Sequence, residues 1–341
     1  MRKFPIGEYV IENYGKPYII AEMNSSHNGK IEVAKQMIDE AIACGCNAVK
    51  FQSWSAESLY SKNYYDENVI ARRMVQRFSL SPDNLKELAC YSREKGIHFS
   101  STPYSEEEVD FLIDECNADF IKIASMDINN YDFLEYIAKK NRPLILSTGM
   151  ATFDEVSTAM RIVEQYQEKV CILHCVSVYP VENEGINLTR LQQLKDMFVE
   201  YPVGFSDHTQ GSVAAVCAVA MGSPIIEKHF TLDSGKIGWD NQMATEPEQM
   251  KILVDSCNEA YKARNMSSES IAVKEAKQRS MMRRSIVAKR ALTAGKRLSK
   301  EDLDAKRPGI GIPPSEMCKI VGRVLRRDIQ ENEIIFLEDM I

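Results

Sequence analysis

Residues 203–208 read VGFSDH, and residues 224–230 read PIIEKHF. Each stretch is a short, mostly apolar run typical of a buried β-strand, and each carries a histidine at or beside its end. Six further runs have the same plan and also end in polar side chains: 18–22, 48–52, 98–103, 120–125, 143–149 and 170–177. Strands of a buried parallel sheet are covered on both faces, so polar groups at the ends of all these runs indicate a shared function.

Amphipathic stretches follow the runs. They cover 31–44, 81–95, 105–116, 131–140, 152–167, 188–198, 211–221 and 245–263. Several begin with Ser, Thr or Asn, which satisfy the backbone N–H groups at helix starts. Eight strand–helix units predict a (β/α)8 barrel, whose active site lies at the carboxyl ends of the strands. An open doubly wound sheet is the alternative, but no G-x-G-x-x-G turn follows the first run.

The sequence changes character after residue 264. Residues 265–284 are polar, helical and rich in charge, and we interpret them as a linker. Residues 285–341 are predicted to form a small β-rich domain, with strands at 285–289, 320–325 and 333–337. The predicted organisation is therefore a catalytic barrel over residues 1–264, a linker, and a separate domain over residues 285–341.

Charge is spread unevenly along the chain. The net charge is −7, yet Lys274–Arg327 alone carries +11, which leaves −18 on the remainder. An acidic remainder repels phosphates, so we expect no nucleic-acid partner and expect the basic segment to face acidic protein surface.

The longest apolar stretch, Val213–Met221, is too short to cross a bilayer. The first residues lack the apolar core of a secretory signal, and the nine cysteines form no C-x-x-C pair. We therefore expect a cytoplasmic protein without a membrane span.

His208 and His229 end two runs that are predicted to be adjacent strands, the seventh and the eighth. Adjacent strands lie under about 5 Å apart, so the two imidazoles can share a divalent cation and leave positions for water and substrate oxygen. If oxygen atoms fill the remaining coordination positions, the site favours Mn²⁺ or Mg²⁺. Two unrelated, hydrogen-bonded histidines are the alternative interpretation.

Two lysines, Lys50 and Lys122, end other runs together with four hydroxyl side chains: Thr102, Ser147, Ser177 and Ser206. Ammonium and hydroxyl groups at one rim suit a phosphate. Lys122 acting as a Schiff-base nucleophile is a competing chemistry. Glu22, at the end of the first run, is either a general acid/base or an anchor for the helix that follows.

These motifs resemble the sialic acid synthase family, in the family's order and over nearly the whole chain. The matching segments are Ala21-Glu22, His27-Asn28-Gly29, Lys50-Phe51-Gln52, Ser101-Thr102-Pro103, Lys122-Ile123-Ala124-Ser125, Ser147-Thr148-Gly149, Gly204-Phe205-Ser206-Asp207-His208 and Glu227-Lys228-His229-Phe230-Thr231-Leu232-Asp233. The segment Lys306-Arg307-Pro308-Gly309-Ile310-Gly311 resembles the antifreeze-like (SAF) domain that these synthases carry.

The resemblance implies that phosphoenolpyruvate condenses with an N-acylated amino-hexose to give a nine-carbon 2-keto-3-deoxy acid and phosphate. It implies that His208 and His229 hold Mn²⁺, with Mg²⁺ or Co²⁺ as alternatives, and that Glu22 is catalytic. It implies a set of phosphoenolpyruvate-binding residues: Lys50, Thr102, Lys122, Ser125, Ser147, Ser177 and Ser206. It implies sugar contacts from Glu22, Gln52, Tyr179, Asp240 and Arg307, the last from the small domain of the other subunit in a domain-swapped homodimer.

Three features depart from the family's usual pattern. Ser26 stands where Asn is common, Ser177 stands where synthases of N-acetylneuraminate usually have Asn, and the Gly238–Asn241 loop stands where Gly-Pro-Asp-His is common. The loop is expected to shape the sugar pocket, so the sequence leaves three acceptors open: N-acetylmannosamine, a diacetamido-dideoxy hexose and a non-acetylated sugar. Two other functions also stay open: a lysine-dependent aldolase, and a catalytically idle sugar-binding barrel whose second domain mediates assembly.

Overall fold

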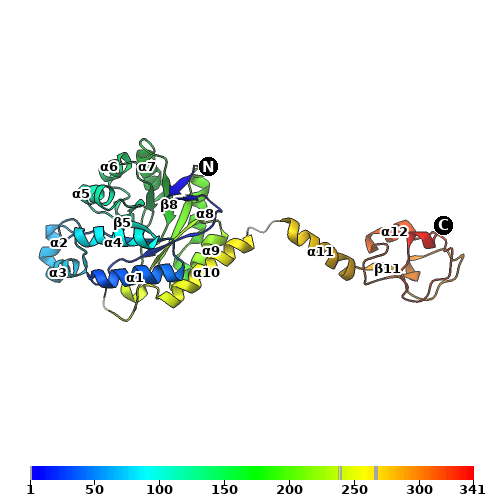
Figure 1. Cartoon of the computed structure of the whole chain (residues 1–341). Helices are drawn as coiled ribbons and strands as arrows, with labels where there is room; N and C mark the ends of the chain where they lie inside the picture. Colours follow the sequence, from blue (N-terminus) through cyan, green and yellow to red (C-terminus); the bar gives the residue numbers. More distant parts are fainter. Residues whose placement is uncertain (1, 237, 239, 265–267) are drawn as a thin grey trace. The chain divides into compact units, whose positions relative to one another are not determined.

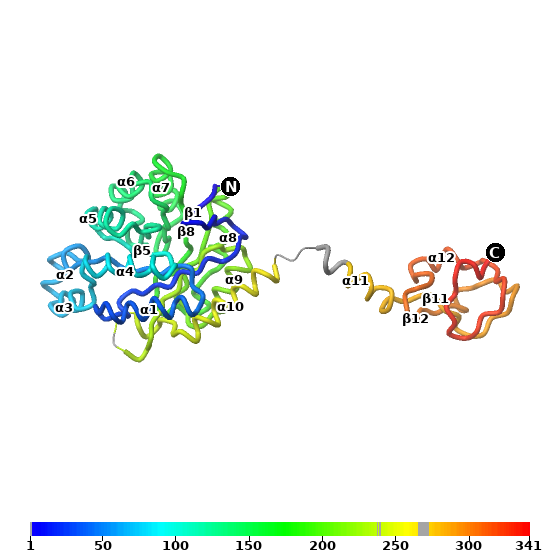
Figure 2. The backbone as a smooth tube through the Cα atoms, viewed as in Figure 1, coloured from blue at the N-terminus to red at the C-terminus, as the bar shows by residue number. Residues whose placement is uncertain are grey.

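The computed structural model describes residues 2–236, 238, 240–264 and 268–341. The chain divides into two compact units, Met1–Arg264 and Asn265–Ile341. Figure 1 shows the helices and strands of each unit, and the path of the backbone can be followed in Figure 2.

The first unit is built on a closed barrel of parallel strands. The strands are β3 (Tyr18–Glu22), β4 (Ala48–Gln52), β5 (His98–Thr102), β6 (Phe120–Ile123), β7 (Leu144–Ser147), β8 (Val170–His174), β9 (Val203–Asp207) and β10 (Ile225–His229). They neighbour one another in chain order, and β10 pairs with β3 to close the cylinder. The predicted (β/α)8 barrel is confirmed, and its eight strands are the eight runs picked out in the sequence.

Helices cover the outside of the barrel. They are α1 (Ile31–Cys44), α4 (Pro82–Lys95), α5 (Glu106–Asp110) with a π-helical turn at Phe111–Glu115, α6 (Tyr131–Lys139), α7 (Phe153–Val163), α8 (Leu188–Met197), α9 (Val213–Ala220) and α10 (Pro247–Arg264). Their ends follow local chemistry. The Ser81 side chain caps α4, and Thr152 with Glu155 forms a capping box at α7. Gly45 ends α1 with φ 86°, a left-handed conformation that glycine adopts without steric cost.

Two features of the barrel unit were not predicted. A hairpin of β1 (Phe4–Ile6) and β2 (Tyr9–Ile11) packs its buried side chains against the starts of the barrel strands, and so closes the end opposite the predicted active site. Two helices, α2 (Lys62–Glu67) and α3 (Val69–Phe78), lie between β4 and α4 and pack around the buried side chain of Trp54.

Single-turn 3-10 helices occur in both units, at Ser125–Asp127, Asn183–Gly185, Asn241–Met243, Lys300–Asp302, Pro314–Glu316 and Leu337–Asp339.

The second unit contains α11 (Ser268–Met282), β11 (Ser285–Ala288), β12 (Leu303–Lys306) and α12 (Met317–Ile320). β11 pairs with β12 in antiparallel fashion, so the strand predicted at 285–289 is present and its partner was not predicted. The strands predicted at 320–325 and 333–337 are wrong. Those segments make only isolated bridges, such as Arg297 to Val324 and Val287 to Ile334.

The physical reason is that much of the unit's small core is filled from segments outside the β11–β12 sheet. Apolar side chains such as Ile320, Leu325 and Ile335 are buried in it without belonging to a sheet, so their apolar pattern does not require a ladder. Among the described residues, no helix is both long enough and apolar enough to span a membrane.

Candidate active site

A cavity of about 430 Å³ lies at the carboxyl ends of the barrel strands, with lining residues from or just after each of them. It brings together all the site residues predicted in the barrel: Glu22, Lys50, Gln52, Thr102, Lys122, Ser125, Ser147, Ser177, Tyr179, Ser206, His208, His229 and Asp240. The remaining predicted residue, Arg307, is an exposed side chain of the second unit.

Strand alternation decides which polar side chains enter the cavity. Glu227 and His229 point into it, whereas Lys228 between them points outward. The Lys228 ammonium donates to Asp207 at 2.9 Å and to the carbonyl of Thr209 at 2.6 Å, both outside the cavity lining. His174 also faces away and hydrogen-bonds the carbonyl of Ile186 at 2.8 Å. The interpretation that the polar side chains at the ends of all the runs share one function is therefore wrong for Lys228 and His174, which face away from the cavity.

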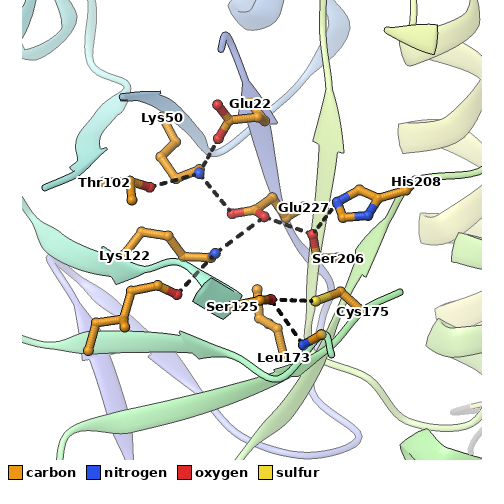
Figure 3. A network of polar contacts seen from close by, with 12 residues as sticks. Glu22, Lys50, Thr102, Lys122, Ser125, Leu173, Cys175, Ser206, His208 and Glu227 are labelled. Carbon is orange, nitrogen blue, oxygen red and sulfur yellow. Dashed lines mark hydrogen bonds and ion pairs between the residues drawn. The ribbon is translucent and has the colours of Figure 1, made fainter. Parts of the chain in front are cut away.

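Glu227 lies at the centre of the polar network at the cavity floor (Figure 3). Its carboxylate is 3.6 Å from the Lys50 ammonium and 3.7 Å from the Lys122 ammonium, and it accepts a hydrogen bond of 2.8 Å from Ser206. Burial alone would raise the pKa of Glu227. The two ammonium groups and the hydroxyl outweigh burial and bring that pKa to about 2, so this carboxylate stays ionised.

Glu22 is in a different electrostatic environment at the same floor. It forms an ion pair with Lys50, and it accepts hydrogen bonds from the Asn24 backbone at 2.9 Å and from Gln52 at 3.2 Å. Burial raises its pKa, and the Lys50 ammonium opposes this effect while the negative charge of Glu227 adds to it. Of the two floor carboxylates, Glu22 is therefore the one suited to taking up and releasing a proton.

The two lysines respond differently to these carboxylates. Burial would lower the pKa of Lys50, but Glu22 and Glu227 outweigh burial and raise it. Burial lowers the pKa of Lys122 despite the facing carboxylate of Glu227. Lys50 also donates to Thr102 at 3.1 Å, which orients its ammonium toward the cavity.

His208 and His229 stand beside the network with their ring centroids 5.4 Å apart. The Nδ1 atom of His208 lies 2.7 Å from the carbonyl oxygen of Val176, which can only accept, so Nδ1 carries the proton and Nε2 keeps its lone pair. Burial lowers the pKa of both histidines, with the neighbouring His208 adding to the effect on His229. Both rings are therefore neutral near pH 7, the state in which imidazole binds metals.

The histidine pair has the donor chemistry to hold a divalent cation. Among the described residues, Nδ1 of His229 is buried without a hydrogen-bond partner, which is costly unless a ligand satisfies it. The part of the chain that the structure describes holds no cluster of three or more His, Cys, Asp or Glu side chains with metal-binding geometry. An ion held by the histidine pair would thus take its other ligands from water or from a substrate oxygen.

A second group of small polar atoms lines the wall formed by the ends of β6 to β8. The Ser125 hydroxyl accepts a hydrogen bond of 3.0 Å from the Gly149 backbone N–H and lies 3.2 Å from the Cys175 sulfur. A Cβ atom at Gly149 would lie 2.3 Å from the Ser177 hydroxyl and 2.8 Å from that of Ser125. Glycine at position 149 thus allows these hydroxyls to converge on one spot, as an anion requires.

Comparisons with known proteins identify the family to which most of the chain belongs. Residues 37–269 match the family model described as the NeuB family, and residues 283–340 match the SAF domain. The chain belongs to the NeuB family. The resemblance to the sialic acid synthases is thereby confirmed, as is the SAF domain at the C-terminal end.

Named relatives of this NeuB-family chain make several different products. It is 37% identical to the N,N'-diacetyllegionaminic acid synthase of Legionella pneumophila over 94% of each chain. It is 32% identical to the N-acetylneuraminate-9-phosphate synthase of Mus musculus, covering 95% of this chain and 92% of that one. The crystal structure of an N-acetylneuraminic acid synthetase from Leptospira borgpetersenii, solved with citrate, superposes with a TM-score of 0.75 at 32% identity, covering 82% of this chain and 96% of that one. The NeuB-family chain is thus an enzyme of the nonulosonic acid synthase class.

Sequence reasoning missed several cavity residues of this NeuB-family site. They are Asn24, Trp54, Leu59, Tyr60, Tyr104, Ala124, Met126, Met150, Cys175 and Glu227. Glu227 carried a usable signal, because it lies two residues before His229 on the same strand face and pairs in register with Ser206. The loop residues carried none, since their approach to the cavity depends on how each loop folds.

The three departures from the family pattern lie in different environments. Ser177 lines the cavity. Ser26 is buried near the start of α1, outside the cavity lining. Within the Gly238–Asn241 loop, Trp239 lies outside the described residues. Asp240 lines the cavity, whereas Asn241 is buried and hydrogen-bonds Thr231 at 2.6 Å, so its amide holds the loop together.

Proposed function

We propose that this enzyme condenses phosphoenolpyruvate with the open-chain aldehyde of an N-acylated amino-hexose, giving a nine-carbon 2-keto-3-deoxy acid and phosphate. The observation that carries the proposal is the composition of one cavity. Two buried ammonium groups and converging hydroxyls lie in it beside two neutral imidazoles. An anionic donor and a carbonyl acceptor need these two environments next to each other.

The donor's phosphate and carboxylate are assigned to the cavity floor. Lys50 and Lys122 supply positive charge, and both are nine-tenths buried or more, so water screens their attraction weakly. The remaining donor ligands are hydroxyls: Thr102, Ser125, Ser147, Ser177 and Ser206. Their role is to position and stabilise the donor, which lowers the entropy cost of bringing its enol carbon to the aldehyde.

His208 and His229 are the residues that would hold the divalent cation, for which Mn²⁺ is proposed, with Mg²⁺ or Co²⁺ as alternatives. When bound, such an ion acts as a Lewis acid on the acceptor's aldehyde oxygen. Tyr179 packs against both rings, with centroids 4.3 Å from His208 and 5.7 Å from His229, and so fixes their orientation.

The reaction balances with one water. The C3 carbon of phosphoenolpyruvate forms a bond to C1 of the sugar, whose carbonyl oxygen takes a proton and becomes a hydroxyl. Water adds to the electron-poor C2 and gives up a proton, for which the Glu22 carboxylate is the acceptor. The bond between C2 and the phosphate oxygen then breaks, the C2 hydroxyl passes its proton to the departing phosphate, and C2 becomes the keto carbon. Asn24 and Gln52 hold Glu22 in place through the hydrogen bonds described above.

Arg307 and the dimer complete the proposal. The guanidinium is an exposed group of the second unit and is proposed to bind the acceptor's amide in the cavity of another subunit. This assignment requires a homodimer with exchanged SAF domains, in which the basic segment around Arg307 faces an acidic barrel.

One observation favours a second function, a lysine-dependent aldolase. Burial lowers the pKa of Lys122, and a neutral amine is what Schiff-base formation requires. The 3.7 Å contact with Glu227 favours the charged ammonium instead. Borohydride reduction in the presence of pyruvate distinguishes the two functions, because a lysine-dependent aldolase forms a Schiff base with the keto group of pyruvate and reduction then leaves a covalent adduct on Lys122.

The test of the proposed function is product analysis by mass spectrometry. The full chain is incubated with phosphoenolpyruvate, Mn²⁺ and a panel of N-acylated hexosamines. We expect a mass equal to acceptor plus pyruvate, with phosphate released only when acceptor is present, and we expect EDTA to stop both. Phosphate release without any acceptor, or turnover that EDTA leaves intact, would contradict the proposal. Product formation and acceptor-dependent phosphate release also distinguish an enzyme from a barrel that only binds the sugar.

A further inference from the structure

A second cavity, of about 350 Å³, lies at the start of α1, and its described lining shares no residue with that of the active-site cavity. We call it the α1 cavity. Three segments that are distant in sequence form it: residues 26–33 at the start of α1, Arg77 near the end of α3, and residues 231–236 after β10. Gly29 lets the first two meet, because it has φ +70° and any Cβ there would collide with the carbonyl oxygen of Arg77.

Each of the three segments contributes one cation to the α1 cavity: Lys30, Arg77 and Lys236. Of these, only Lys236 forms an ion pair among the described residues, with Asp233 at 3.6 Å. Asp233 is also the only carboxylate in the described lining. The described lining therefore carries a net charge of +2, and Lys30 and Arg77 hold it without a carboxylate partner in the described part of the chain. Cations gathered in one concave site attract an anion.

An unsatisfied hydroxyl lies in the same cavity. Ser26 is only 6% exposed and lines the α1 cavity, yet its hydroxyl hydrogen-bonds no described residue. A buried polar group of this kind is costly unless a ligand or water satisfies it. The position is one at which the chain departs from the family's usual Asn, and a serine fills less of the cavity than an asparagine would. The first turn of α1, a helix of 14 residues, also receives no side-chain cap from its described N-cap residue, Lys30.

We propose that the α1 cavity binds a phosphate dianion, either free or as the monoester of a small metabolite. Such a group carries close to two negative charges near pH 7, which balances the charge of the lining. Its oxygens accept hydrogen bonds from the Ser26 hydroxyl, the Arg77 guanidinium and the Lys30 ammonium. This site is separate from the proposed donor site at the barrel floor and does not depend on the proposed reaction.

An anion in the α1 cavity would connect two loops that also reach the active site. The loop before α1 carries Asn24 and the loop after β10 carries Asp240, and these two side chains line the active-site cavity, where the Asn24 amide donates to the Asp240 carboxyl. Asn241 holds the second loop from within, because its amide donates to the carbonyls of Asp233 at 2.7 Å and Lys236 at 2.8 Å. We therefore expect the bound anion to slow the opening of both loops.

The test is titration calorimetry of the full chain with inorganic phosphate and, separately, with glucose 6-phosphate as a probe ester. Arg77→Gln and Lys30→Gln should each weaken binding at the α1 cavity by about tenfold, because each removes a charge-assisted hydrogen bond. Arg73→Gln is the matched control, since Arg73 is an exposed arginine of the same helix outside the described lining, and it should bind like the wild type. The barrel floor is the same in all these proteins, so a difference between them reports on the α1 cavity. Tighter binding of the ester supports a metabolite ester as the ligand, and tighter or equal binding of inorganic phosphate supports the free anion.

Hydrogen exchange with and without phosphate locates the site. Phosphate should slow amide exchange in residues 26–33 and 231–236 of the wild type and of Arg73→Gln, and much less in Arg77→Gln. If Arg77→Gln and Lys30→Gln bind both probes as Arg73→Gln does, or if protection is confined to the barrel floor, the inference is wrong. Neither measurement uses turnover, so that result would leave the proposed function intact, and a failed product assay would leave this site intact.

Discussion

Replacing Glu227 by glutamine tests the charge network that the sequence did not reveal. The change removes a negative charge from between Lys50 and Lys122 and keeps the shape of the side chain. Each ammonium lies 3.6–3.7 Å from the carboxylate. At an effective dielectric constant of about 20, that distance corresponds to a gross attraction of roughly 4–5 kcal/mol per pair.

The net loss of stability is smaller than the sum of these attractions. Removing Glu227's charge also removes the cost of burying it, and Lys50 keeps its ion pair with Glu22. Lys122 loses its nearest carboxylate, and breaking a buried pair on one side costs about 3–5 kcal/mol. We therefore expect Glu227→Gln to lower the free energy of unfolding by about 3 kcal/mol, which corresponds to a melting temperature lower by roughly 6–12 °C.

The assay is thermal unfolding of the full chain at pH 7, with and without inorganic phosphate. Because the phosphate dianion supplies the negative charge that the variant lacks, phosphate should raise the melting temperature of Glu227→Gln more than that of the wild type. Glu108→Gln is the control, since Glu108 is a partly buried carboxyl that hydrogen-bonds Ser58 at 2.6 Å and does not line the active-site cavity. Equal phosphate effects on variant and wild type, or a variant as stable as the wild type, would refute the argument.

The same variant has a defined dependence on pH. The pKa of Glu227 falls from its ordinary value of 4.5 to about 2 in the folded chain. A lowered pKa stabilises the fold above the ordinary value, and that contribution is lost as the pH falls from about 4.5 toward 2. Glu22 has a raised pKa and acts in the opposite direction, and its contribution is smaller in the variant because the Glu227 charge is only one of the causes of that raised pKa, after burial. The melting-temperature difference between wild type and variant should therefore shrink between pH 6 and pH 3, and a constant difference would contradict the assignment.

Three further substitutions test separate parts of the site. His229→Ala should lower kcat more than about 100-fold, while its circular dichroism spectrum and melting temperature stay near those of the wild type. Retained activity would contradict the assignment of His229 as a metal ligand. Gly149→Ala should lower kcat/KM for phosphoenolpyruvate by about 10–100-fold, because the new Cβ displaces the hydroxyls of Ser125 and Ser177; steady-state kinetics with an unchanged value would show that these hydroxyls do not hold the donor. Arg307→Ala should raise the KM of the acceptor more than that of phosphoenolpyruvate, and equal effects on both would argue against a role for the SAF domain in sugar binding.

The barrel could be predicted from sequence because its pattern repeats. Each strand is a short apolar run bounded by turns, and each is followed by an amphipathic stretch, so errors at one boundary do not propagate to the next. The hairpin Phe4–Ile11 escaped prediction because its three-residue strands are too short to show periodicity. The strands predicted at 320–325 and 333–337 failed for a related reason. In a unit of this size, burial of Leu325 or Ile335 needs only a bend in the chain, and an apolar pattern cannot distinguish a bend from a strand.

The site could be predicted only as far as strand ends define it. Histidines and lysines in apolar runs are conspicuous, so His208, His229, Lys50 and Lys122 are predicted as site residues, and all four line the cavity. Glu227 was not selected, because its partners come from strands that are distant in sequence and meet only when the barrel closes. The loop residues that line the cavity were beyond reach, since they belong to loops without a periodic pattern.

The charges of the floor limit how the proposed donor could bind. Lys50 and Lys122 are balanced by Glu22 and Glu227, so the described floor is close to neutral before any substrate enters. Phosphoenolpyruvate carries about three negative charges near pH 7, counting its carboxylate and its phosphate. A neutral floor cannot hold such an anion at low cost in a buried site. One feature of the structure offers compensation: the neutral histidine pair, which suits a divalent cation. A cation held there would strengthen binding of the proposed donor and would leave the Glu22 carboxylate ionised, as its proposed role as proton acceptor requires.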